Sequence, residues 1–203
     1  MSQWSEVNQF LDRPEVDNAI WFIGGADCSE ANVGKILDEA MQQFEEESIG
    51  VVTGGTEEGL PEIAARRAKE YGIPTLGVYP ERGEKYFLEE VNDHGVIVSP
   101  SYGESTWGDE SEVGAKIADG VIVFGGSEGT MAEYSLSQKD DSAYAVAIKG
   151  TGGLADDLHN MNIYSESDYT PDSDIQNGRE AAKFILNNLN DDNYDFETSA
   201  AEV

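Results

Sequence analysis

The sequence predicts an α/β fold, a Rossmann-like three-layer αβα sandwich with a mostly parallel sheet. Three observations support this prediction. Short apolar runs recur along the chain, helix-like stretches with one apolar face separate several of them, and most runs end at Gly, Pro or Ser. The runs are continuously apolar rather than alternating, which is typical of strands covered on both faces. We therefore expect helices on each side of a sheet that is wound right-handed.

The apolar runs have the length of buried strands, and the stretches between them have helical spacing. Expected strands cover residues 19–23, 49–52, 75–79, 95–98, 120–124 and 143–148. The clearest helix covers 29–47, where Val33, Leu37 and Phe44 share one face and Ser29 suits the N-cap. Further helices are expected over 60–71, with Pro61 near its start and Gly72 after its end, over 109–118 and over 174–189.

The length of 203 residues suits one compact domain. We expect an N-terminal extension over residues 1–18, one Rossmann-like domain over 19–190 and a mobile acidic tail over 191–203. No repeat of a supersecondary unit and no linker divides the chain further.

Acidic residues dominate the composition. Asp and Glu number 41 against 12 Lys and Arg, which gives a net charge of −29 spread over successive segments. This charge disfavours general binding to nucleic acid or to anionic lipid, so we expect neither as a partner. An acid-coated surface predicts a halophilic, cytoplasmic protein, although an ordinary acidic protein remains the alternative.

The sequence indicates no disulfide, no metal site and no membrane segment. Cys28 is the single cysteine, and His94 and His159 lack further ligands at metal-binding spacing. The first 18 residues lack the pattern of a secretory signal, and no run approaches the ~20 apolar residues that span a bilayer. We predict neither a metal nor a cofactor.

Glycine-rich segments follow four of the expected strands. In a parallel sheet these segments meet at one edge, where glycine lets the backbone approach a ligand and helix N-termini attract anions. The sequence therefore predicts a crevice that binds a nucleotide phosphate. The residues expected to contact it are Gly24, Gly25, Gly54, Gly55, Thr56, Gly59, Gly125, Gly126, Ser127, Gly129, Thr130, Gly152 and Gly153.

Two of these segments match a family pattern. The segment from Thr53 to Leu60 resembles the GGxxG motif, and that from Gly125 to Glu133 resembles the PGGxGTxxE motif, of the Lonely Guy (LOG)/SLOG superfamily of Rossmann-like nucleotide-binding proteins, also described as lysine-decarboxylase-like. The resemblance covers roughly residues 19 to 157. It implies a nucleoside phosphate as ligand and a homodimer as assembly.

The resemblance also implies a role for Glu133, which stands at the motif glutamate and would face the ribose. A carboxylate there can stabilise an oxocarbenium-like sugar or direct a water, which makes Glu133 the candidate catalytic residue. The alternative is that Glu133 faces solvent or bonds to local backbone. Enzymes of the family also carry an Arg in the preceding helix, where this chain has Asp109 to Glu112 instead.

These features leave two functions open. The first is a nucleotide-binding protein of the LOG/SLOG type, acting as a sensor or carrier; the second is an N-glycosidic hydrolase or transferase, similar to a phosphoribohydrolase or deoxyribosyltransferase, that uses Glu133. A dinucleotide-dependent oxidoreductase is disfavoured because Gly24 and Gly25 lack the GxGxxG spacing. Trp107 and Tyr102, in a polar segment after the fourth expected strand, are candidates for stacking on a base.

The charge distribution yields a first prediction. Raising KCl from 0.1 M to 1 M shortens the Debye length from about 10 Å to about 3 Å, which screens the repulsion among surface carboxylates. We expect the melting temperature to rise over this range, measured by differential scanning calorimetry. A melting temperature that stays constant or falls would instead indicate an ordinary acidic protein.

Overall fold

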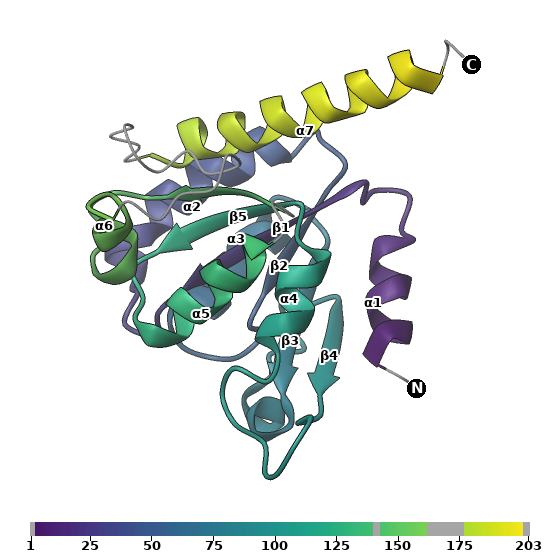
Figure 1. Ribbon diagram of the computed structural model, residues 1–203. Coiled ribbons are helices and arrows are strands. Elements are labelled where there is room, and N and C mark those ends of the chain that lie inside the picture. The colour runs from purple at the N-terminus through teal and green to yellow at the C-terminus, as the bar shows by residue number, and fades with distance from the viewer. Residues whose placement is uncertain (1–2, 140–142, 162–176, 201–203) are drawn as a thin grey trace.

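The computed structural model describes residues 3–139, 143–161 and 177–200 (Figure 1). Its centre is a six-stranded sheet in the order β4-β3-β2-β1-β5-β6, and all neighbouring strands are parallel. The strands are β1 (Asn18–Gly24), β2 (Ile49–Thr53), β3 (Thr75–Pro80), β4 (His94–Val98), β5 (Gly120–Phe124) and β6 (Tyr144–Ala147). Each predicted apolar run forms one of these strands, which confirms the predicted fold class.

The direction of winding reverses at β1. Strands β2 to β4 follow one another on one side of β1, while β5 pairs with its other side, with Trp21 opposite Val52 and Ile23 opposite Val123. The connections that leave β1 and β5 therefore diverge to opposite faces of the sheet. Such a reversal opens a crevice at the carboxyl ends of the two strands.

Helices cover both faces of the sheet and complete three layers (Figure 1). On one face lie α2 (Glu30–Phe44), α3 (Gly59–Glu70) and α7 (Gly178–Ala200), which pack on alternate β1 side chains such as Ile20 and Phe22. The other face carries α4 (Ser111–Ile117), α5 (Glu128–Ser137) and α6 (Gly153–Leu158). A short 3-10 helix, η1 (Glu81–Tyr86), follows β3.

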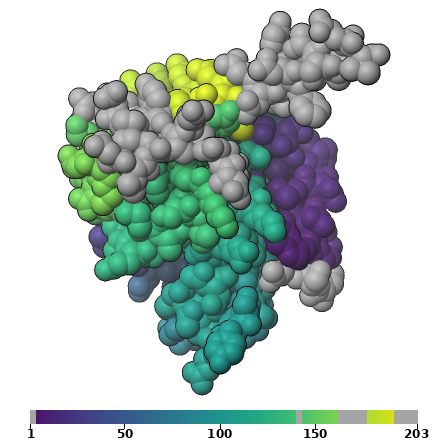
Figure 2. Space-filling model, in the orientation of Figure 1, coloured from purple at the N-terminus to yellow at the C-terminus, as the bar shows by residue number. Residues whose placement is uncertain are grey.

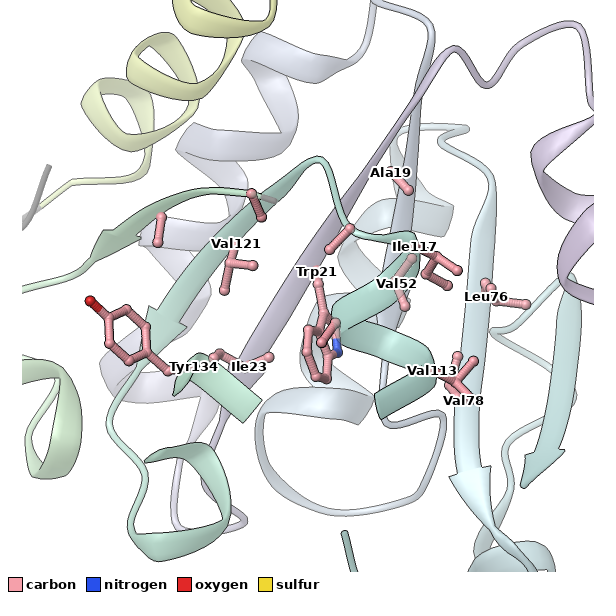
Figure 3. Packing of buried hydrophobic residues seen from close by; sticks show 14 of the residues in the cluster. Ala19, Trp21, Ile23, Val52, Leu76, Val78, Val113, Ile117, Val121 and Tyr134 are labelled. Atoms are coloured by element: carbon pink, nitrogen blue, oxygen red, sulfur yellow. The ribbon is translucent and has the colours of Figure 1, made fainter. Parts of the chain in front are cut away.

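The core beneath α4 is built around Trp21 of β1. Figure 3 shows Trp21 together with Val113 and Ile117 of α4, which belong to the same buried cluster. Gly114 makes the close approach of α4 to Trp21 possible, because a Cβ at that position would lie 2.5 Å from the indole ring. The N-terminal half of α4, with Glu110 at its N-cap, is thereby held against β1.

Several boundaries differ from the sequence prediction. A helix that the sequence did not predict, α1 (Gln3–Leu11), lies along the side of the molecule, shown in purple in Figure 2, and buries Val7 and Phe10. The last helix was expected to end at residue 189 but continues to Ala200, so the segment predicted to be a mobile tail is helical up to that residue. The predicted start of that helix, residue 174, lies outside the described residues.

In the part of the chain that the structure describes, no helix has both the length and the apolar composition that a membrane span requires.

Candidate functional site

A cleft of about 950 Å³ opens at the carboxyl ends of β1, β2 and β5, where the sequence predicted a crevice. The segments after these three strands form its floor and walls. Of the predicted phosphate-contacting residues, those that line the cleft are Gly24, Gly25, Gly54, Thr56, Ser127, Gly129 and Thr130, and Glu133 lines it with them.

The N-terminus of α5 is the most suitable anion site in this cleft. Ser127 occupies the N-cap position, yet its side chain makes no capping hydrogen bond. The first N–H groups of a helix have no partner within the helix, and the helix dipole adds positive potential there. Gly129 in this first turn has no atom within 4 Å of where a Cβ would lie, so the turn stands open. This arrangement can accept a phosphate without a basic side chain.

The remaining predicted glycines shape the cleft from behind. Gly55, Gly59, Gly125, Gly126, Gly152 and Gly153 are not among its lining residues. Gly125 donates its N–H to the Thr151 hydroxyl over 3.0 Å, and the Leu154 N–H donates to the Gly126 carbonyl over 2.9 Å. The loop after β6 thus fixes the loop after β5.

A similar backbone contact fixes the loop after β1. The Leu60 N–H at the start of α3 donates to the Gly25 carbonyl over 3.2 Å. Gly59 has a φ of +67°, and a Cβ there would lie 2.4 Å from the Ala26 Cα. Glycine is needed at residue 59 for both reasons.

Two aromatic rings form one rim of the cleft. Tyr86 of η1 and Trp107 both line it, and their ring centroids lie 6.3 Å apart at an interplanar angle of 30°. Trp107 is 53% exposed and is available to stack on a ligand, whereas Tyr102 is 95% exposed and lies outside the lining residues. Tyr86 was missed by the sequence analysis, since nothing in the sequence links it to a segment 21 residues further along.

A pair of carboxyl groups forms the deep wall. Glu110, the N-cap residue of α4, and Glu133, in the second turn of α5, both line the cleft and are partly buried. Burial, followed by the charge of Glu110, raises the pKa of Glu133 to about 8. Burial also raises the pKa of Glu110, whose Oε2 accepts the Gly108 N–H over 2.9 Å. At neutral pH Glu133 therefore carries a proton.

Cys28 and His159, which the sequence analysis also considered, do not line the cleft. The Cys28 thiol is buried, its Sγ lies 3.8 Å from the Phe124 carbonyl, and burial raises its pKa, so it is not an activated nucleophile. His159 contacts the Ala147 carbonyl. Among the described residues, no group of three or more His, Cys, Asp or Glu is arranged to hold a metal ion.

The family model of the SLOG cluster4 family matches residues 18–170, which include every strand and the entire cleft lining. The chain belongs to the SLOG cluster4 family. This finding confirms the superfamily that the two glycine motifs predicted. No curated protein matches the sequence.

Solved structures share the fold of this SLOG cluster4 protein at low sequence identity. The X-ray structure of TM1055 has a TM-score of 0.62 and 19% identity, covering 84% of this chain and 99% of that one. The Moco carrier protein from Chlamydomonas reinhardtii has a TM-score of 0.63 and 22% identity, covering 84% and 98%. DNA processing protein A from Streptococcus pneumoniae has a TM-score of 0.58 and 18% identity, covering 83% and 60%.

The contact between the loops after β5 and β6 gives a prediction. Gly153 has a φ of +49°, and a Cβ there would lie 2.2 Å from the Gly126 carbonyl oxygen. We expect Gly153→Ala to lower the free energy of unfolding by more than about 1 kcal/mol in chemical denaturation. Gly129→Ala is the matched control, because its Cβ has open space in a helical turn, and should raise stability by about 0.5 kcal/mol. Equal effects of the two substitutions would contradict the prediction.

The raised pKa of Glu133 gives a second prediction. Between the ordinary pKa of 4.5 and about 8, the folded protein holds a proton that the unfolded chain has released, so stability falls as pH rises through this window. Glu133→Gln removes this loss. We expect its melting temperature to match that of the wild type near pH 5 and to exceed it by about 3 °C or more at pH 9.

The control for this experiment is Glu128→Gln, which changes an exposed glutamate of the same helix. Its melting temperature should track that of the wild type at every pH. A constant difference between Glu133→Gln and the wild type over the pH range would show that Glu133 ionises normally.

Proposed function

We propose that this SLOG cluster4 protein binds a nucleoside phosphate in the cleft, with the phosphate at the N-terminus of α5. The open first turn of α5, formed by Ser127, Glu128 and Gly129, carries this proposal, because it offers unpaired N–H groups at the switch point of the sheet. The aromatic rim of Tyr86 and Trp107 offers a surface for the base.

Binding without turnover is the favoured role, as in a sensor or carrier. In LOG enzymes an Arg pairs with the motif glutamate, and here Glu110 faces Glu133 instead. A protonated Glu133 beside a second carboxyl group is poorly suited to stabilise a cationic sugar at neutral pH. The Chlamydomonas neighbour is described as a carrier, which agrees with binding alone, although its 22% identity shows only the shared fold.

The second candidate is N-glycosidic cleavage with Glu133 as a general acid. A pKa of about 8 in a cleft that suits a nucleotide is the observation in its favour, since such a group can protonate a leaving base near neutral pH. In that case Glu133 would act by donating a proton to the leaving base, and not by stabilising the positive charge of the sugar.

We also propose that the protein is a halophilic, cytoplasmic homodimer that binds neither membranes nor nucleic acid. The net charge of −29 supports this view. The Streptococcus neighbour is named as a DNA processing protein, but such a charge opposes contact with a phosphate backbone.

A pair of substitutions at one position tests the proposed phosphate site. Gly129→Glu places a negative side chain into the open first turn of α5, whereas Gly129→Ala fills the same space without charge. We expect the first to weaken binding of AMP or GMP in 1 M KCl at least about tenfold and the second to change it less than about threefold, by calorimetric titration.

Chromatography of the same mixtures separates the two functions. Bound nucleotide that stays intact supports a binding protein, and release of free base that stops in Glu133→Gln supports a hydrolase. If Gly129→Glu and Gly129→Ala bind the nucleotide with equal affinity, the phosphate does not lie at the N-terminus of α5.

A further inference from the structure

The two carboxyl groups in the cleft have few hydrogen-bond partners within the described protein. Glu110 accepts one hydrogen bond, from the Gly108 N–H, through Oε2. Glu133 accepts none from any described residue, although it points into the cleft from the second turn of α5. Partly buried polar groups without partners cost free energy, which a ligand with matching groups would recover.

The two carboxyl groups come from helices that pack against each other, α4 and α5. Two carboxyls that interact strongly in a shielded site share one proton over a wide pH range. Further negative groups surround them: Asp109 lies beside Glu110, and Glu57, Glu58 and Glu128 line the same cleft. Two cations lie at the aromatic rim: the Arg82 guanidinium carbon is 5.6 Å from the Trp107 ring centroid and also acts on Asp109, and the Lys85 Nζ is 4.5 Å from the Tyr86 ring centroid. The pair therefore offers one ionised carboxylate and one carboxyl O–H.

This pattern selects among the bases of nucleotides. An ionised carboxylate accepts two parallel hydrogen bonds, and a carboxyl O–H donates one. Guanine presents, in order, the O6 acceptor, the N1–H donor and the 2-amino donor. Adenine presents one donor beside an acceptor, and uracil presents one donor between two acceptors. Only guanine among the common bases gives two adjacent donors to the charged carboxylate and an acceptor to the protonated one.

We propose that Glu110 and Glu133 bind the Watson–Crick edge of a guanine-type base, a 2-amino-4-oxopyrimidine ring, in a ligand whose phosphate lies at α5. This inference rests on the proposed function. Glu110 takes the N1–H and 2-amino groups, and Glu133 donates to the O6 oxygen. Tyr86 and Trp107, on the rim of the same cleft, contact the ring face. Glu110 thus replaces the family Arg with a group that sets base specificity.

The test compares ligands that differ by one group. GMP and IMP differ only in the 2-amino group, and AMP presents the opposite pattern. We expect the wild type, in 1 M KCl at pH 7, to bind GMP at least about tenfold more tightly than IMP or AMP in calorimetric titration. Equal affinity for GMP and IMP would overturn the inference.

Three variants assign the roles. Glu110→Gln keeps an acceptor for the Gly108 N–H but loses the charge and one acceptor, so the preference for GMP over IMP should fall below about threefold. Glu133→Gln keeps a donor for O6 and should retain that preference. Glu112→Gln, an exposed acid of α4 outside the cleft lining, is the control and should behave as the wild type. A Glu110→Gln variant indistinguishable from this control would contradict the assignment.

The pH profile gives a readout that a structural role would not produce. Wild-type affinity for GMP should fall between pH 7 and pH 8.8 as Glu133 loses its proton and repels O6, Glu110 and the phosphate. The affinity of Glu133→Gln for GMP should stay constant over the same pH range. If the affinities of the wild type and of Glu133→Gln change with pH in the same way, the proton on Glu133 has no role in binding.

Two further comparisons separate the outcomes. If GMP and IMP bind equally and Gly129→Glu abolishes both, the phosphate site stands and the base assignment falls; if no nucleotide binds, both fall. Pterins carry the same 2-amino-4-oxopyrimidine edge, so dihydroneopterin triphosphate is titrated beside GMP. Preference for GMP over IMP supports the shared edge, and the ratio of the affinities for GMP and dihydroneopterin triphosphate shows which ring system the cleft prefers.

Discussion

Backbone hydrogen bonds between the glycine-rich loops hold the cleft in shape. The loop after β1 is fixed by the start of α3 through the Gly25 carbonyl, and the loop after β5 is fixed by the start of α6 through the Gly126 carbonyl. In these contacts two backbone segments lie so close together that a Cβ atom would clash with the neighbouring backbone, as it would at Gly59 and Gly153. Glycines that never reach the cavity are therefore as important to the site as those that line it.

This backbone framework gives a chain of net charge −29 a means to form the anion site that we propose. Helix dipoles and free N–H groups supply positive potential that is fixed in direction and needs no cationic side chain. Gly129 leaves open space in the first turn of α5, and Glu128 in the same turn is exposed to solvent. Attraction at this point is local, whereas the repulsion from the surface is long-ranged and is screened by salt.

The deep wall distinguishes this protein from the LOG enzymes that its motifs resemble. An Arg beside the motif glutamate would keep that glutamate ionised, whereas here burial, and after it the charge of Glu110, raises the pKa of Glu133. The acids from Asp109 to Glu112, in the region where the family Arg is expected, thus favour a Glu133 that donates a hydrogen bond over one that stabilises positive charge. The same fold, with the same glycine loops, is thus compatible with the binding role that we propose.

The sequence by itself determined the strands, the glycine-rich turns and the place of Glu133 in a helix, because each depends on a short, continuous pattern. The continuous apolar runs indicated strands, and all of them formed one parallel sheet, in which the edge strand β4 is only partly buried. Helix ends were less accurate, and α1 was missed although Val7 and Phe10 recur at helical spacing; these two residues pack at the β4 edge of the sheet. Tertiary structure alone decided that Glu110 and Glu133 line the same cleft, that Tyr86 lies beside Trp107 and that Gly153 packs against Gly126. These are contacts between segments far apart in the chain, and the burial that sets their chemistry exists only after the helices have packed.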